Sequence, residues 1–452
     1  MQSITDINSE AITEANSSED AAQQGYRVLF QNKAFISLWL GQIFSQLADR
    51  IIFVLYIALI VSHFSHEGKY RSLLYVAFTI PAIALTAIAG VFVDRWPRKT
   101  VLIVSNLLRA FVIALTPLAI KSGTLWSLYA SAFMISVSTQ FFAPAESASI
   151  PTLVPKNQLL VANSLFTTTM MASLVFGFAL GDPLITLMGL DNVHWAIFGL
   201  FLLSCVFLLT VKMPDNPQKL ETLDEIGEIT KTAKTVLTDL WEGFKALIHE
   251  PELLRKMLQL TLLFSYVVAM SILFISFAED FLYPNPVIAA RKFPWLIMTS
   301  GLGMLLGSYI VGRYLRHRNQ EKLISIGFIG VGISLAMLVI TPLVSTRLIH
   351  SMLPLFTYRV LFAHVMTALM GVTSAFIAVP LQALLHDLIP EHTRGRVLGI
   401  QFTLLSTGST LPAVFAGFGA DYFGVLPMFA LMAAPLLLIA GGGLYHQWKK
   451  LG

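Results

Sequence analysis

The chain has 452 residues, of which 56% are hydrophobic and only 12% are charged, and its formal net charge is +4. No soluble globular domain of this length is so apolar, so the composition indicates a polytopic membrane protein. The small net charge excludes nucleic acid as an implied partner. The single cysteine, Cys205, excludes a disulfide within the chain and offers no thiol cluster for a metal.

The first 25 residues are polar and acidic, without a basic start or an early apolar core, so they do not form a cleavable signal. We expect residues 1–25 to be a disordered cytoplasmic tail. A helix needs roughly 20 apolar residues to cross a bilayer. The region 26–213, expected to form an N-terminal bundle, contains six such runs: residues 34–62, 73–93, 100–120, 126–150, 159–180 and 195–211.

One long polar segment follows, and apolar residues recur within it at spacings of three and four. This spacing predicts an amphipathic helix within a cytoplasmic linker, residues 214–252. The region 253–447, expected to form a C-terminal bundle, contains six further runs: residues 258–281, 294–314, 323–344, 352–385, 397–420 and 426–445. The fourth of these is longer than a span, so it must extend beyond the bilayer or break near Pro380.

The lysines and arginines give the expected orientation. Most of the 30 fall on segments that share one side when both termini are cytoplasmic. The opposite side has only Lys69, Arg71, Lys121, Arg291, Lys292 and Arg347. The positive-inside rule therefore places both termini in the cytoplasm of a plasma (inner) membrane protein.

The two halves of the sequence repeat. At an offset of 218 residues, the segment around Asp94 and Arg98 falls on Gly312 and Arg316. Further along, at an offset of 236, Glu146 falls on Gln382. The repeat predicts an all-α membrane protein of about twelve spans, arranged as two pseudo-symmetric six-helix bundles with a binding site between them.

A charged turn between the second and third spans carries the clearest motif. Residues 90–99 read Gly-Val-Phe-Val-Asp-Arg-Trp-Pro-Arg-Lys. The pattern Gly-x-x-x-Asp-Arg-x-x-Arg-Lys resembles the loop signature of the major facilitator superfamily, with Pro97 in place of the usual glycine. Residues 38–49, 141–146 and 153–164 resemble the branch that includes enterobactin and macrolide exporters. This resemblance implies the two-bundle transporter fold and alternating access.

The charged turn also predicts a conformational latch. Gly90 allows close helix approach, Asp94 is expected to face the start of the eleventh span, and Arg98 is expected to pair with Glu146. The predicted latch set is Gly90, Asp94, Arg95, Arg98, Glu146, Arg313, Arg316 and Gly395. We predict that Asp94→Asn or Arg98→Ala stops transport while the protein still inserts. The alternative is a solvated positive-inside loop without a gating role.

Polar residues on the first span predict the central site. Gln42, Gln46 and Asp49 follow i, i+4 and i+7, so they share one helix face. Asp49 lies roughly 20 Å from the inner end of its helix, at 1.5 Å per residue. A carboxyl at that depth can bind and release a proton during a transport cycle. The alternative is a structural partner to a buried arginine, and Arg50 is expected to point elsewhere.

The sequence does not decide the roles of the other ionisable residues in the spans. Arg109 is expected either to line the cavity or to pack, and Arg359 and His364 share a helix in the outer half. A packing role for His364 competes with a coupling role. Glu279 and Asp280 are expected to begin a solvated loop.

The sequence contains no phosphate-binding loop, His/Cys metal cluster or nucleophile elbow, so we expect neither an enzyme nor a cofactor. We expect a monomeric secondary transporter that exports a small amphipathic molecule, such as a drug or siderophore, in exchange for protons. The alternatives are a metabolite uptake symporter, a lysophospholipid flippase, or a membrane-embedded enzyme or scaffold.

Overall fold

The computed structural model describes residues 28–64, 67–155, 158–213, 250–315, 318–345, 357–389 and 394–451. The predicted tail, 1–25, lies outside these residues. The predicted linker, 214–252, also lies outside them except for residues 250–252, where the next long helix begins.

Each predicted span of the first half falls on a helix, with the third span divided at Leu115. Asn32 begins the first of these helices, because its side chain accepts the N–H of Phe35 and donates to the Leu153 carbonyl at 2.7 Å. The helices are α2 (Lys33–His63), α3 (Gly68–Arg95), α4 (Arg98–Ala114) with α5 (Thr116–Lys121), α6 (Leu125–Leu153), α7 (Leu159–Met188) and α8 (Val193–Thr210).

The second half repeats this series with four additions, η2, α11, η3 and η4. Its predicted fourth span does not break at Pro380 but continues as one long helix. The helices are α10 (Pro251–Phe277) continued by η2 (Ala278–Leu282), α11 (Pro286–Lys292), α12 (Pro294–Ile310) continued by η3 (Val311–Leu315), α13 (Gln320–Val339), η4 (Thr341–Leu343), α14 (Tyr358–Leu388), α15 (Arg394–Phe423) and α16 (Val425–Leu451).

Length and composition support a membrane location for many of these helices. Among the described residues, seven helices are long and apolar enough to cross a bilayer, and an eighth qualifies if the bent α7 counts as one span. Prolines interrupt the interiors of α3, α6, α15 and α16, which fall outside that set.

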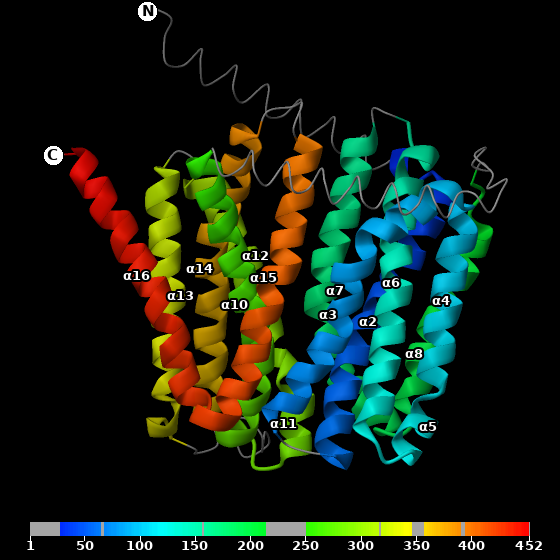
Figure 1. The fold of residues 1–452 in the computed structure, drawn as a ribbon, viewed down its shortest axis with the longest axis horizontal. Coiled ribbons are helices and arrows are strands. Elements are labelled where there is room, and N and C mark those ends of the chain that lie inside the picture. Colours follow the sequence, from blue (N-terminus) through cyan, green and yellow to red (C-terminus); the bar gives the residue numbers. More distant parts are fainter. Residues whose placement is uncertain are drawn as a thin grey trace, which may run out of the picture.

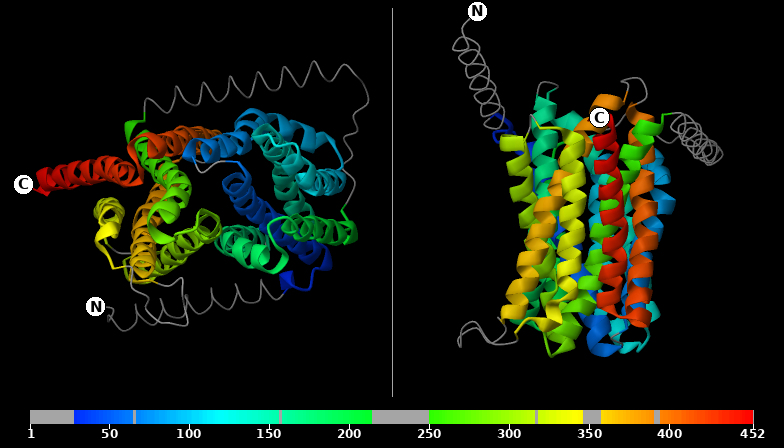
Figure 2. Two further views of the ribbon diagram at one scale, coloured as in Figure 1. Left: turned by 90° about the horizontal axis from the view of Figure 1, so that it is seen from below. Right: turned by 90° about the vertical axis from the view of Figure 1, so that its left-hand side faces the viewer.

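The two halves pack their helices in corresponding pairs. The contacts of α2 with α7, α3 with α6, α4 with α6, and α4 with α8 recur as α10 with α15, α12 with α14, α13 with α14, and α13 with α16. Figure 1 shows the halves side by side, and the end-on view in Figure 2 separates them. The predicted arrangement of two pseudo-symmetric six-helix bundles is therefore confirmed.

The long helices define two ends of the molecule. The hinge end is where α3 stops at Arg95 and α4 starts at Arg98, and the α11 end is the opposite one (Figure 1). Contacts between the halves join α3 to α15 and α10, α7 to α12, and α2 to α11. Because α11 packs on α2 and α7, it connects the second half to the first.

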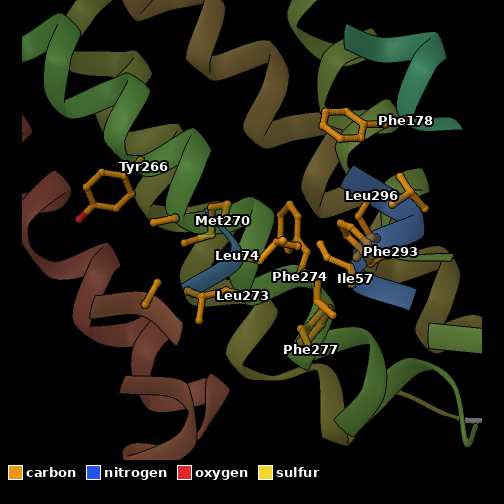
Figure 3. Close-up of a cluster of buried hydrophobic side chains, with 14 of the residues drawn as sticks. Ile57, Leu74, Phe178, Tyr266, Met270, Leu273, Phe274, Phe277, Phe293 and Leu296 are labelled. Carbon is orange, nitrogen blue, oxygen red and sulfur yellow. The ribbon is translucent and has the colours of Figure 1, made fainter. Parts of the chain in front are cut away.

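Buried aromatic and aliphatic side chains fill the space between the halves. Figure 3 shows Ile57 and Leu74 of the first half beside Phe274, Phe277 and Phe293 of the second. Each of these side chains is at most 2% exposed. Close packing of this kind leaves no path for water through that part of the interface.

Candidate functional site

A cavity of about 390 Å³ lies between the two halves. The first half supplies a polar and aromatic wall, whereas the second half supplies an almost entirely apolar one. The first wall consists of Gln46, Asp49, Arg50, Phe53, Tyr75, Phe78, Ile135, Ser136, Thr139, Gln140 and Phe178, and the second of Val267, Val268, Ser271 and Ile297. The cavity is large enough for a drug-sized molecule.

Asp49 lines this cavity and forms an ion pair behind it. Its Oδ2 atom accepts a hydrogen bond of 2.8 Å from Nη1 of Arg109. The Asp49 side chain is 23% exposed, whereas that of Arg109 is fully buried. The structure thus combines the two roles that the sequence left open for Asp49, because the residue lines the cavity and also pairs with a buried arginine.

A chain of hydrogen bonds holds Arg109 from behind. Its Nη2 donates to Asn106 Oδ1 at 2.5 Å, and the Asn106 amide donates to Ser204 Oγ at 2.7 Å. Ser204 in turn donates to the Gly41 carbonyl at 2.6 Å, and Ser45 donates to Asn106. This network joins α2, α4 and α8, and sequence reasoning missed it because serines and an asparagine in apolar runs give no distinctive signal.

Two aromatic rings complete the arginine site. The Arg109 guanidinium carbon lies 4.6 Å from the centre of the Phe142 ring and 5.0 Å from that of Phe201. Such contacts are favourable for a desolvated guanidinium. The ion pair, the amide and the rings together fix Arg109 beside the cavity rather than on its wall.

The other polar residues of α2 divide between the cavity and the helix packing. Gln46 lines the cavity as predicted by its helix face. Gln42 is only 3% exposed, and its amide makes a long contact of 3.5 Å to the Phe166 carbonyl. Arg50 was expected to point elsewhere, but it lines the cavity, with its guanidinium 5.9 Å from the Phe178 ring centre.

Arg359 and His364 lie on α14 and are absent from the cavity wall. Arg359 donates to the carbonyl groups of Pro342 at 2.9 Å and of Phe281 at 3.3 Å. His364 Nδ1 lies 3.3 Å from Thr299 Oγ1 on α12. The structure therefore separates these two residues from Asp49 and places Arg359 in the packing of the turns.

Arg98 binds a backbone carbonyl in this structure, so its pairing with Glu146 in the outward-open state stays a prediction. Arg98 donates to the Ala148 carbonyl at 2.7 Å, close to the end of α6, where a cation interacts favourably with the helix dipole. Glu146 is 8% exposed, and its Oε1 atom is buried without a hydrogen-bond partner in the part of the chain that the structure describes.

The rest of the predicted latch stays a prediction. Gly90, Asp94 and Arg95 lie in the last turns of α3, and Gly395 lies at the start of α15, but their surroundings are outside the part of the structure that is described. Arg316 is also outside it, whereas Arg313 is exposed, with its guanidinium 6.0 Å from the Tyr314 ring centre.

Ion pairs join the halves at the α11 end. Arg71 of α3 pairs with Glu279 of η2 at 2.9 Å, and these side chains are 2% and 9% exposed. The expectation of a solvated loop start at Glu279 is therefore wrong. The residue was misassigned because its partner is more than 200 positions away in the sequence.

A second ion pair and a helix cap lie at the same end. Asp182 of α7 accepts from Lys292 at 2.6 Å and from Arg291 at 3.1 Å, both on α11. Asp421 of α15 accepts the backbone N–H groups of Gly68 and Lys69 and so caps α3 from the other half. With the apolar cluster of Figure 3, these contacts close the α11 end.

Comparison with known proteins agrees with this architecture. The family described as Major Facilitator Superfamily matches residues 38–368. An uncharacterized MFS-type transporter, YfiS, of Bacillus subtilis is 28% identical over 422 residues, 91% of this chain and 93% of its own length. The multidrug efflux pump Tap of Mycolicibacterium fortuitum is 25% identical over 83% of this chain and 87% of its own. Macrolide efflux protein A of Streptococcus pyogenes is 23% identical over 90% of this chain and 94% of its own length.

Solved structures show the same fold at low sequence identity. The nucleoside transporter NupG gives a TM-score of 0.65 at 12% identity, covering 91% of this chain and 98% of that protein. A bacterial homologue of the iron transporter ferroportin gives a TM-score of 0.63 at 16% identity, covering 91% of this chain and 98% of that protein. The family match covers most of the chain, and the structure has paired six-helix bundles with a cavity between them. The chain therefore belongs to the major facilitator superfamily and is a multi-pass membrane transporter.

Proposed function

We propose that this protein exports small amphipathic molecules in exchange for protons. The observation that carries the proposal is a cavity between the two halves with one charged wall and one apolar wall. Such walls suit a molecule that has both an apolar body and a polar or charged group. Relatives named as a multidrug efflux pump and a macrolide efflux protein support export as the direction.

The aromatic side chains on the cavity wall favour a bulky substrate. Phe53, Tyr75, Phe78 and Phe178 place aromatic rings on the wall, where they can stack on an apolar body. Gln46, Gln140 and Asp49 offer polar contacts at the same surface. Asp49 is the residue we propose for coupling to substrate, because its carboxylate alone joins the cavity to the buried Arg109.

The closed α11 end supports alternating access. Apolar packing and ion pairs such as Arg71 with Glu279 join the halves at that end, so we propose that exchange with water takes place from the hinge end. The positive-inside rule assigns the hinge end to the cytoplasm. We therefore propose that this structure is the loading state of an exporter, acting as a monomer in the plasma (inner) membrane with both termini cytoplasmic.

Closure of the hinge end requires contacts that form in the opposite state. We propose that Asp94 and Gly395 provide them as α3 and α15 approach. Asp94→Asn and Arg98→Ala should then lower transport strongly without lowering the amount of inserted protein. Normal transport by both variants would exclude the latch.

Transport into liposomes tests the function. Purified protein in vesicles with an acidic lumen should accumulate ethidium or erythromycin, and collapse of the pH gradient by nigericin should abolish accumulation. Asp49→Asn should remove accumulation against a gradient, whereas Asp191→Asn, an exposed carboxyl in the turn after α7, should not. Accumulation only with an alkaline lumen would indicate a symporter, and lipid scrambling without accumulation would indicate a flippase.

A further inference from the structure

Arg50 of α2 lies on the wall of the cavity between the two halves. No hydrogen bond or ion pair joins its guanidinium to another residue in the part of the chain that the structure describes, and its Nε atom is buried without a partner. The Phe178 ring lies beside it, with the ring centre 5.9 Å from the guanidinium carbon. A cation without an anion inside a membrane protein is costly and usually functional.

The packing of α2 against α7 makes room for the Arg50 side chain. A Cβ atom added at Gly177 of α7 would lie only 2.8 Å from the Arg50 Cβ and 2.9 Å from its Cγ. A side chain at position 177 would therefore displace the stem of Arg50 from its path between the two helices. Because Phe178 follows directly, one turn of α7 both admits the arginine and holds its charged end beside the cavity.

Asp49, the neighbour of Arg50 in sequence, does not supply the missing partner. Its Oδ2 atom accepts a hydrogen bond of 2.8 Å from Arg109, which lies behind the cavity. Asp49 is also the one carboxylate described on the cavity wall. Two arginines therefore share a single carboxylate at this place.

The helices that pack against α2 are α3, α6, α7, α8 and α11, and they contain three acidic residues. None of the three is described on the cavity wall. Asp182 of α7 already binds Arg291 and Lys292 of α11. It is therefore engaged at the α11 end.

The other two acids, Glu146 and Asp94, come later along their helices, toward the hinge end. On α6, Gln140 lines the cavity and Glu146 follows six residues later, roughly 9 Å further at 1.5 Å per residue. On α3, Phe78 lines the cavity and Asp94 follows sixteen residues later, roughly 24 Å further. The second half adds no acid to the described wall, which it builds from Val267, Val268, Ser271 and Ile297.

We infer that Arg50 binds an oxyanion of the substrate, so that the cavity takes amphipathic molecules that carry a carboxylate or a similar group. This inference rests on the proposed function and names part of its substrate range. A guanidinium presents paired N–H groups that match the two oxygens of a carboxylate. Ethidium has no oxyanion, so the subsite adds acidic molecules to the range and does not account for every substrate.

The rest of the cavity suits an acid with an aromatic body. Phe53, Phe78 and Phe178 line the same cavity as Arg50, and their rings can stack on an apolar group. The wall from the second half is almost entirely apolar. A carboxylate at Arg50 therefore leaves the body of the molecule among apolar side chains and gives Arg50 the anion that the protein does not supply.

Two ligands that differ in one group test the subsite. Dansylglycine carries a carboxylate, and dansylglycinamide carries an uncharged amide on the same aromatic body. The purified wild type in an uncharged detergent at neutral pH should bind the acid roughly tenfold to a hundredfold more tightly, since hydrogen bonds between charged groups are strong. Isothermal titration calorimetry measures both affinities. Equal affinities, or failure to bind the acid, would overturn the inference.

Variants test whether the preference comes from Arg50. Arg50→Gln should bind the acid and the amide with similar affinity. Arg313→Gln makes the same change at an exposed arginine of η3 and should keep the wild-type preference. A preference for the acid that persists in Arg50→Gln would contradict the assignment. The comparison of the two ligands on the wild type holds even if Arg50→Gln fails to fold.

Transport in liposomes separates this inference from the proposed function. A wild type that accumulates ethidium under a pH gradient but binds the acid and the amide alike keeps the proposed function and loses the subsite. A wild type that prefers the acid through Arg50 but ignores the pH gradient keeps the subsite and loses the proposed function.

Discussion

The two six-helix halves share one packing scheme but differ in what fills it. In the first half, Asp49 and Arg109 form a charged cluster supported by hydrogen bonds to Asn106. In the second half, the position of α10 that matches Asp49 at the offset of 218 is Val267, an apolar residue of the cavity wall. The helices of the two halves therefore pack alike, whereas the side chains at matching positions differ in charge and polarity.

Glycines bring two helices of the second half into close contact. A Cβ atom added at Gly303 would overlap the Ala368 carbonyl, and one added at Gly371 would overlap the Ser300 carbonyl. Helices α12 and α14 are thus in reciprocal backbone contact, which favours a tight pair of transmembrane helices. We therefore expect α12 and α14 to keep their contact and the second half to move as a rigid body during transport.

The largest expected effect comes from breaking the charged cluster. Arg109→Leu leaves Asp49 without its partner, which should destabilise the protein by roughly 3–5 kcal/mol. Unfolding of the purified variant in detergent measures this loss. Arg313→Leu, which changes an exposed arginine of the second half, is the control and should be nearly neutral. Equal stability of the two variants would show that the cluster is not structural.

The next effect comes from separating the glycine-packed helices. Gly371→Ala forces α14 away from the Ser300 carbonyl and should cost about 2–3 kcal/mol, as overpacking does. The same measurement on Gly199→Ala in the first half should show no loss, because nothing lies within 4 Å of its added Cβ. A stable Gly371→Ala would argue against a rigid second half.

A smaller effect should follow from weakening the seal between the halves. Asp182→Asn removes charge-assisted hydrogen bonds to Arg291 and Lys292, at a cost of about 2 kcal/mol. In a Cys205→Ser background, a cysteine at Ser136 in the cavity should then react faster with an impermeant reagent added from the α11 end. An unchanged rate would mean that Asp182 does not hold that end closed.

The smallest effect concerns the two cavity walls. Gln46→Ala should lower transport roughly three- to tenfold if the amide binds substrate, since one hydrogen bond is worth about 1 kcal/mol. Ser271→Ala should change transport less than about twofold, because its hydroxyl already donates to the Val268 carbonyl on its own helix. Larger loss in Ser271→Ala would place substrate recognition on the second wall.

The sequence predicted the spans well because runs of roughly 20 apolar residues have few alternatives to a membrane helix. It predicted the cavity positions of Gln46 and Asp49 because helical spacing places them on one face. It did not predict that Arg98 binds the Ala148 carbonyl in this structure. Spacing along one helix cannot tell which neighbouring helix a side chain faces.

The sequence by itself determined the membrane class, the prediction of about twelve spans, the repeat and the family resemblance, since these depend on apolar length and short local motifs. Only the tertiary structure decided which ions meet: Asp49 with Arg109, Arg71 with Glu279, and Asp182 with α11. The partners in each of these pairs are 60 or more positions apart. Their meeting depends on how whole helices pack, which no local pattern of residues encodes.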